Sequence, residues 1–557
     1  MKQIQPLRGL VIGLLAVAGL SSGATAQPAP PVLESPLSEV IDVRVVNVEV
    51  VVEEKGARVR GLGPQDFILE VDGREVAVEY FTEVEGGLAI ERTSQGDATV
   101  PALEPGSAVG TSYLVFVDDF FTRPPDRDRV LQGLLEQLPN LTPQDRMAIV
   151  AYDGKKVDML SSWSSDLAEL TRVLRKAKDR PAYGLQRTAE QRIFESARDL
   201  EELRNNARRG SQANQGDFRR SVDLEEEQLA QRISDQVRRA TTAAASALRS
   251  FANPPGRKVM MIYSGGWPSD PGTWVTSDPY LSSRLTGVRR GEQLTGPLAD
   301  NANRLGYTLY MIDVPGIVNT GVDASESSLA EATLLLDRRR NREVEEEATL
   351  YHLAERTGGK ALVNSNNVDA FERVVADTRS YYWLGFTPAW KGDDSQHKVE
   401  VKLRQKGPDI RTRKGFSDLS RASEVNMMVE SSLLFGDPPT SEPLQVEVGR
   451  GQKSGFSLRE VPLKVFIPLH ALTFVPGGEG YVSDAELRVA VLDEDGNSSE
   501  IPVVPLVFGG KGPPKAGVIH HWETKLKMRT KRHDLVVSIY DKISGKILSA
   551  KVEVPKL

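Results

Sequence analysis

Tyr113-Leu-Val-Phe-Val117, followed at once by Asp118-Asp-Phe-Phe-Thr122, is the most informative part of this chain. Five consecutive apolar residues have the length and composition of a strand that is buried on both faces. The run ends abruptly in two carboxylates. Because ligands of open α/β sheets bind just outside the carboxyl ends of the strands, these carboxylates are predicted to lie where metal binding or recognition takes place.

Strand-like and helix-like patterns alternate from residue 111 to about 380, which predicts a mostly parallel sheet covered on both faces. The predicted strands are 113–117, 146–152, 156–160, 258–263, 307–312 and 360–363. Residues 185–239 carry a narrow apolar stripe among many charges, and they are predicted to form a projecting antiparallel helical hairpin. Its charges are typical of a solvated helical face, and a partner surface is the alternative.

Strand-rich segments flank this region on both sides. Residues 41–88 alternate apolar and polar side chains, and Asp72-Gly73 is a two-residue hairpin signal. Residues 381–417 are predicted to return to this β-rich N-terminal unit, and residues 421–557 to form a β-sandwich. The predicted fold class is therefore α/β: a doubly wound, mostly parallel sheet with a β-rich N-terminal unit and a C-terminal β-sandwich.

The N-terminus has the three parts of a secretory signal: a basic start, the apolar run Gly9–Leu20, and Ala24-Thr25-Ala26 as a cleavage site. Residues 1–26 are thus predicted to be a signal peptide and residues 27–40 a Pro-rich tether. An uncleaved membrane anchor is the alternative, although the run is short for a bilayer span. No later stretch is long and apolar enough to span. An exported chain is expected, in the periplasm, at the cell surface or secreted.

Composition narrows the chemistry further. The 557 residues are too many for one core and carry a net charge of −7, which argues weakly against nucleic acid as a partner. The chain has no cysteine, so disulfides, thiol catalysis and thiolate metal sites are excluded. An exported protein without cysteine suits a bacterial envelope.

The order of these segments resembles a von Willebrand factor type A (VWFA) domain, and several local motifs resemble the exported bacterial (acidobacterial-type) VWFA-related family. The motifs are Val46–Val50, Gly61–Phe67 with Asp72-Gly73, Leu353–Ala361, Tyr381–Pro388, and His397–Val401 with Arg413–Phe416. They span roughly residues 40–417, and the resemblance does not extend to residues 421–557.

The resemblance implies a divalent cation held by three loops. The first loop of the family reads Asp-x-Ser-x-Ser; here Asp118 is present, Phe120 replaces the first Ser, and Thr122 stands in for the second. The second loop offers a Thr, for which Thr188 is one candidate. The third loop reads Ser/Thr-Asp-Gly, but Ser264-Gly-Gly stands here, so one carboxylate is missing.

Mg²⁺ requires several oxygen ligands in near-octahedral geometry. The resemblance therefore implies a degenerate metal-ion-dependent adhesion site with Asp118 and Thr122 as its remaining metal ligands. No cofactor is predicted, and Mg²⁺ at these two residues stays open as the alternative. A further alternative is that Asp118 and Asp119 accept hydrogen bonds from backbone amides in the loop or cap the following helix.

Other candidate chemistry is weaker. Asp493–Ser498 partly resembles a calcium loop but lacks the acidic twelfth ligand, so a hairpin turn is favoured. His520, His521 and His533 are more typical of exposed strands than of a metal site. Ser264-Gly-Gly-Trp267 lacks the Gly that precedes a nucleophile elbow. No acid–base constellation is predicted, and the chain is not expected to be an enzyme.

Aromatic residues gather near the predicted strand ends: Phe120, Phe121, Trp267, Trp274 and Tyr280. Because aromatic residues are enriched in protein interfaces, Phe120, Phe121, Ser264 and Trp267 are predicted to form a partner-binding rim. Buried packing beneath the loop 264–300 is the rival interpretation. The predicted function is an exported, non-enzymatic module that binds a protein partner in the cell envelope. The alternatives are a metal-dependent adhesion protein that uses Asp118 and Thr122, and an envelope hydrolase with an unrecognised site.

Overall fold

The computed structural model describes residues 45–90, 100–101, 103–186, 215–251, 256–276, 285, 287–315, 329–435, 440, 442–454, 458–477, 480–494 and 501–556. The chain divides into two compact units, Val43–Ser420 and Met1–Asp42 with Arg421–Leu557. The predicted signal peptide and tether lie outside the described residues, as do Thr188, Tyr280 and the first arm of the predicted helical hairpin.

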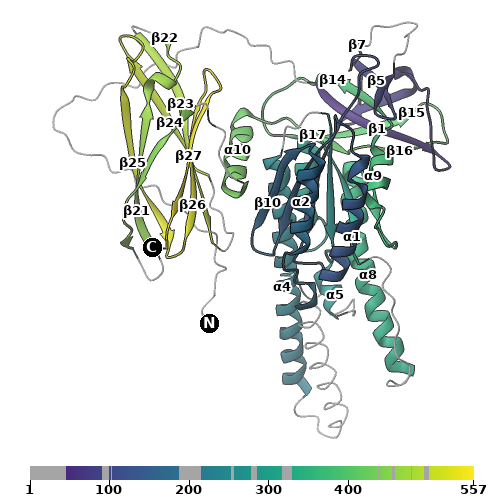
Figure 1. The fold of residues 1–557 in the computed structure, drawn as a ribbon. Coiled ribbons are helices and arrows are strands. Elements are labelled where there is room, and N and C mark those ends of the chain that lie inside the picture. Colours follow the sequence, from purple (N-terminus) through teal and green to yellow (C-terminus); the bar gives the residue numbers. More distant parts are fainter. Residues whose placement is uncertain are drawn as a thin grey trace. The chain divides into compact units, whose positions relative to one another are not determined.

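The sheet at the centre of the first unit has the strand order β10-β9-β8-β11-β12-β13 (Figure 1). Its strands are β8 (Thr111–Asp118), β9 (Arg146–Tyr152), β10 (Val157–Ser164), β11 (Arg257–Ser264), β12 (Tyr307–Asp313) and β13 (Ala361–Leu362). Neighbouring strands run parallel, except that β10 runs antiparallel to β9. Every residue of β8 is buried, as expected for a central strand that is covered on both faces.

Helices cover this sheet. Three of them, α1 (Pro124–Gln137), α2 (Leu167–Lys178) and α9 (Ala370–Thr378), pack on the face that carries Tyr113 and Val115. Four others are α4 (Gln215–Ser250), α5 (Pro271–Thr276), α7 (Glu292–Leu305) and α8 (Leu329–Thr357). Helix α4 packs on α5 and α7, and α8 lies along β12. Residues 215–239 belong to this one long helix α4, which continues to Ser250 because its apolar periodicity does not stop at residue 239.

Two largely antiparallel sheets form the β-rich part of the first unit. One has the order β16-β1-β14-β5-β6, with β2 on β1 and β7 on β5, and the other has the order β17-β15-β3-β4. The strands are β1 (Val46–Glu54), β2 (Ala57–Arg58), β3 (Phe67–Val71), β4 (Arg74–Val76), β5 (Tyr80–Glu85), β6 (Leu88–Ile90), β7 (Val100–Pro101), β14 (Tyr381–Phe386), β15 (Gln396–Leu403), β16 (Asp409–Arg411) and β17 (Gly415–Ser417). Asp72 and Gly73 both have positive φ, as a type I′ turn between β3 and β4 requires.

The second unit is a sandwich of two sheets. One has the order β18-β27-β26-β23-β22 with β24 on β23, and the other has the order β19-β21-β20 with β25 on β21. The strands are β18 (Glu442–Pro443), β19 (Gln445–Val448), β20 (Gln452–Lys453), β21 (Leu458–Pro468), β22 (Val475–Gly477), β23 (Gly480–Asp493), β24 (Val503–Gly510), β25 (Ile519–Arg529), β26 (His533–Asp541) and β27 (Ile547–Val554). Apolar side chains of both sheets, such as Leu463 and Leu487, form the core between them.

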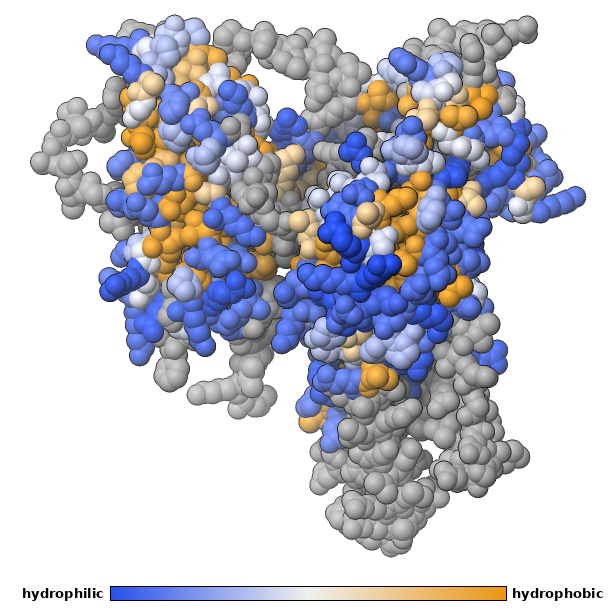
Figure 2. Space-filling view, viewed as in Figure 1, coloured by the Kyte–Doolittle hydropathy of each residue, from blue (hydrophilic) through white to orange (hydrophobic). Residues whose placement is uncertain are grey.

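A helix that the sequence did not predict, α10 (Arg421–Phe435), packs against this sandwich. Its Val425 and Val429 contact Ala490 and Val536 on β23 and β26. The helix escaped prediction because its apolar residues recur with little helical periodicity. Figure 2 shows hydrophobic residues exposed over the sandwich strands, and the most exposed large one is Val507 on β24, at 69%.

The predicted fold class is wrong for the chain as a whole. Of the five sheets in the described residues, four are mainly antiparallel, and only the sheet around β8 is mainly parallel. The chain is a strand-rich assembly of mostly antiparallel sheets, not a doubly wound parallel α/β fold. Apolar periodicity identifies a strand, but the direction of its neighbours depends on pairings far apart in sequence. Within the described residues, no helix is long and apolar enough to cross a bilayer.

Candidate functional site

The carboxylate of Asp118 lies at the carboxyl end of β8, where the sequence predicted a metal ligand, and it is fully buried. Its Oδ1 accepts hydrogen bonds from the backbone N–H groups of Phe120 at 3.1 Å and Phe121 at 3.0 Å. Its Oδ2 accepts from the Ser264 hydroxyl at 2.7 Å and from the Trp267 indole Nε1 at 2.8 Å. Both carboxylate oxygens therefore bind donors of the chain itself.

Thr122, the second predicted ligand, lies in the same loop and is also buried. Its hydroxyl donates to the backbone oxygen of Asp118 at 2.6 Å. The structure thus brings the two predicted ligands together, but their polar groups engage protein atoms. Among the described residues, no group of three or more His, Asp or Glu side chains is arranged to hold a metal ion. Metal binding at Asp118 and Thr122 stays a prediction.

Asp119 is buried as well and belongs to a separate ion-pair cluster. Its Oδ1 lies 2.9 Å from Nη1 of Arg127 on α1, and its Oδ2 lies 2.8 Å from Nε of Arg180. Arg127 also donates to the backbone oxygens of Lys178 and Arg180. Burial raises the pKa of the Asp119 carboxyl, and the two guanidinium groups oppose that effect. Asp119 therefore anchors α1 and the end of α2 to the strand end.

Neighbouring loops press against residues 118–122. A Cβ added to Gly265 would lie 2.0 Å from the backbone oxygen of Phe121, and one added to Gly184 would lie 2.5 Å from backbone atoms of Thr122. Position 265 is where the resembling family carries its second carboxylate. The close approach of the Phe121 backbone leaves no room there for any side chain.

The predicted rim aromatics lie largely inside the protein. Trp267 is 0% exposed, Phe121 5%, and Phe120 is half-buried. Trp274 is buried too, and its indole Nε1 donates to Glu346 on α8 at 3.1 Å. Ser264 is fully buried, and its hydroxyl donates a hydrogen bond to Asp118. These positions match the rival interpretation of buried packing, because a partner cannot reach side chains with so little exposed surface.

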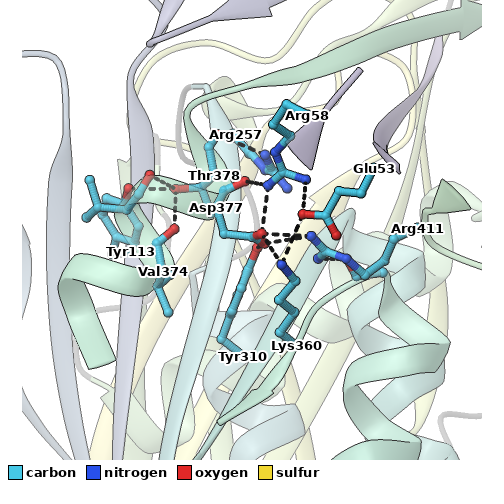
Figure 3. A network of polar contacts seen from close by, with 12 residues as sticks. Glu53, Arg58, Tyr113, Arg257, Tyr310, Lys360, Val374, Asp377, Thr378 and Arg411 are labelled. Atoms are coloured by element: carbon cyan, nitrogen blue, oxygen red, sulfur yellow. Dashed lines mark hydrogen bonds and ion pairs between the residues drawn. The ribbon is translucent and has the colours of Figure 1, made fainter. Parts of the chain in front are cut away.

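A second polar network, which the sequence did not reveal, lies elsewhere in the same unit (Figure 3). Its centre is Asp377 on α9, whose side chain is 6% exposed. Three cations surround this carboxylate, at 2.6 Å for Arg58, 2.7 Å for Lys360 and 2.8 Å for Arg411. Glu53 on β1 shares two of them, at 2.8 Å from Arg58 and 3.2 Å from Lys360.

This network connects the β-rich part of the unit to the central sheet. Arg58 and Arg411 come from β2 and β16, whereas Asp377 and Tyr310 come from α9 and β12. The Tyr310 hydroxyl also donates to the Asp377 carboxylate. Burial alone would raise the pKa of Asp377, but Arg411 and Lys360 outweigh burial and hold it well below its usual range. The arrangement is that of a structural clasp, since each charge has a protein partner.

One hydrogen-bonded series has the connectivity of a catalytic triad. His397 Nδ1 lies 2.7 Å from Asp72 Oδ2, and His397 Nε2 lies 3.0 Å from the Ser395 hydroxyl. The imidazole stacks on Phe416, with 4.9 Å between ring centroids. The sequence carried only an indirect signal for this series, because Asp72 lies in the hairpin turn and His397 in a family motif.

The surroundings of Ser395 differ from those of a catalytic serine. Its side chain also hydrogen-bonds the exposed Asp393 carboxyl and lowers the pKa of that group. The backbone N–H groups of Lys391, Gly392 and Asp394 donate to oxygens of Asp418. The backbone N–H of Ser395 donates to the Asp393 carboxylate. These N–H groups are therefore not available to stabilise an oxyanion.

The histidines of the sandwich are not brought together. His520 and His521 lie exposed on β25 and contact the rings of Phe508 and Phe466. His533 is buried on β26, which belongs to the other sheet. Asp493 pairs with Arg529 at 3.4 Å, and residues 495–498 of the predicted turn lie outside the described residues.

Comparisons with known proteins add little. Neither a scan against protein-family models nor a search of curated proteins gave a match. The crystal structure of the SpRpn10 VWA domain is similar over 36% of this chain and 73% of that chain, with 9% identity and a TM-score of 0.16. Bacteroides uniformis β-glucuronidase is similar over 32% of this chain and 19% of that chain, with 8% identity and a TM-score of 0.15. Neither similarity assigns a fold or a function to this chain.

Proposed function

We propose that this chain is an exported, non-enzymatic protein-binding module of the cell envelope whose recognition does not depend on a divalent cation. The observation that carries the proposal is the bonding of Asp118, whose carboxylate accepts two backbone N–H groups, the Ser264 hydroxyl and the Trp267 indole N–H. Export and the envelope partner rest on the signal-like N-terminus and on the motifs that resemble the VWFA-related family.

The energy of these bonds argues against a cation at Asp118. A hydrogen bond to a charged group contributes about 1.5–3 kcal/mol, and a cation would have to displace at least the donors on Oδ2. The neighbouring Gly265 brings no carboxylate that would compensate. The second candidate function, metal-dependent adhesion through Asp118 and Thr122, is therefore the weaker one.

The geometry around Ser395 supports the non-enzymatic part of the proposal. It is the described arrangement that comes nearest to a hydrolytic site, yet its amides are already bonded and an exposed carboxylate competes for the hydroxyl. A hydrolase would need donors for the developing oxyanion.

The test is capture of partners from an envelope extract of the source organism by the immobilised mature chain, in millimolar Mg²⁺ and in EDTA. We expect the same proteins in both conditions. A ligand that binds the native state raises the melting temperature. Because we expect no Mg²⁺ to bind, the melting temperature should be the same with and without it. Capture that requires Mg²⁺, together with a rise in melting temperature that Asp118→Asn abolishes, would establish the adhesion function instead.

A further inference from the structure

Helix α8 carries an apolar stripe on its solvent-exposed side. One side of the helix packs on β12, α7 and α5. On the other side, Val344 is 56% exposed, Tyr351 is 50% exposed, and Ala348 between them is exposed as well. The spacing of four and three residues places all three side chains on one face of the helix.

Carboxylates flank this stripe. Glu343 and Glu347 lie along one side of it, and Glu355 continues it by one turn. Desolvation and the nearby Glu347 carboxylate raise the pKa of Tyr351, which places that charge close to the stripe. In the described part of the chain, none of the three glutamates forms an ion pair, whereas His352 and Arg356 on the far flank pair with Glu292.

We propose that this face, made of Val344, Ala348 and Tyr351 with Glu343, Glu347 and Glu355, docks a cationic amphipathic helix of a partner protein. The inference rests on the proposed function and adds to it the binding surface and the chemical class of the partner. The apolar stripe would bury the apolar face of such a helix. Lys or Arg side chains at its border would pair with the glutamates, for which the described part of the chain supplies no ion-pair partner.

The negative charge beside the stripe argues against other ligands of this face. A second copy of this chain with its α8 packed in parallel would bring Glu343 and Glu347 against the same carboxylates, and like charges across an interface are unfavourable. Nucleic acids and anionic lipid surfaces are negatively charged too, and both recruit Lys and Arg rather than Glu. A helix with Lys or Arg beside its apolar face would cover the apolar stripe and form ion pairs with the glutamates at its border.

The first experiment measures binding of a synthetic amphipathic helix built of leucine and lysine to the mature chain, by fluorescence anisotropy. Val344→Ser with Tyr351→Ser should weaken the affinity about tenfold or more, as for exposed anchors of a docked helix. Glu343→Lys with Glu347→Lys should weaken it by a similar factor. These side chains are exposed, so the fold is expected to tolerate the changes, and circular dichroism verifies it.

The matched control reverses the charge of two exposed glutamates on another helix, by Glu225→Lys with Glu227→Lys on α4. It should change the affinity less than about twofold, because rim charges far from a contact contribute little. If the charge reversals on α8 and on α4 weaken the affinity equally, the net charge of the chain alone attracts the peptide, and the inference is overturned. Unchanged affinity of the Val344 and Tyr351 variant would overturn it as well.

The second experiment repeats the capture from envelope extract with the Val344→Ser, Tyr351→Ser chain. If the natural chain captures a protein and this variant captures it equally well, the α8 surface is wrong while the proposed function stands. If the natural chain captures nothing specific, the proposed function fails, and the peptide measurement still decides whether α8 is a docking face.

Discussion

The indole N–H of Trp267 donates to the carboxylate of Asp118, with 2.8 Å between Nε1 and Oδ2. The two residues are 149 positions apart, one at the end of β8 and the other in the segment after β11. A neutral donor thus binds the buried carboxylate where the resembling family would place a cation. This bond joins the segment after β11 to the carboxyl end of β8.

Trp267→Phe tests the energy of this bond. The substitution removes the N–H from a buried carboxylate and should lower the free energy of unfolding by about 2 kcal/mol beyond the loss of packing. Urea denaturation followed by circular dichroism measures it. The matched control is Trp383→Phe, because the buried Nε1 of Trp383 has no hydrogen-bond partner among the described residues. Equal losses for the two variants would show that the bond to Asp118 is energetically unimportant.

Gly265→Ala tests whether backbone packing excludes a side chain from the third loop. The new Cβ would lie 2.0 Å from the Phe121 oxygen, so the loop has to move, at a cost of about 1–3 kcal/mol. Gly287→Ala is the control, since no heavy atom of the described residues lies within 4 Å of its added Cβ, and it should change stability by less than about 0.5 kcal/mol. Full stability of Gly265→Ala in thermal unfolding would contradict the close packing.

Asp377→Asn tests the clasp between the β-rich part and the central sheet. Because the pKa of Asp377 is lowered in the folded state, its contribution is present above the unfolded pKa of about 4 and is lost as the pH falls through the folded pKa. We expect a loss of about 3 kcal/mol near neutral pH, which shrinks as the pH falls below about 4. Urea unfolding across this range measures it.

The control for that prediction is the exposed carboxylate of Asp409, which lies on β16 near Arg411. Asp409→Asn should leave the free energy of unfolding almost unchanged both near neutral pH and below about pH 4, because exposed charges contribute about 0–1 kcal/mol. A loss for Asp377→Asn that stays constant down to the lowest pH would show that shape, rather than charge, holds the clasp together.

Ser395 is expected to be unreactive toward a fluorophosphonate probe despite its hydrogen bond to His397. Without free donors for the oxyanion, acylation or phosphonylation of its hydroxyl has no stabilised intermediate. Intact-mass spectrometry should show no adduct on the mature chain. An adduct that Ser395→Ala and His397→Gln both abolish would reveal a hydrolase.

Pro505 is expected to protect the edge of the sandwich. In the described residues, its strand β24 pairs with β23 alone, contains no charged side chain and exposes Val503 and Val507. An edge of this kind pairs readily with other chains, and a proline interrupts the donors that such pairing needs. Pro505→Thr should therefore increase self-association in analytical ultracentrifugation, whereas Pro514→Thr, in the loop that follows, should not.

Part of the fold was readable from local pattern. The apolar run before Asp118 marks β8 because a strand buried on both faces needs no polar alternation. Asp72-Gly73 predicts its turn because both residues tolerate positive φ. The fold class was wrong because strand direction depends on partners such as β1 and β14, which are more than 300 residues apart.

The end of β8 and its acidic character can be read from the sequence, since the length of an apolar run and the types of its side chains are local properties. The bonding of Asp118 cannot be read in this way, because its donors Ser264 and Trp267 come from a segment about 150 residues away. The same holds for the burial of Phe121 and for the clasp at Asp377. The exposed stripe on α8 also required the structure, since only packing shows which face of an apolar-rich helix stays in water.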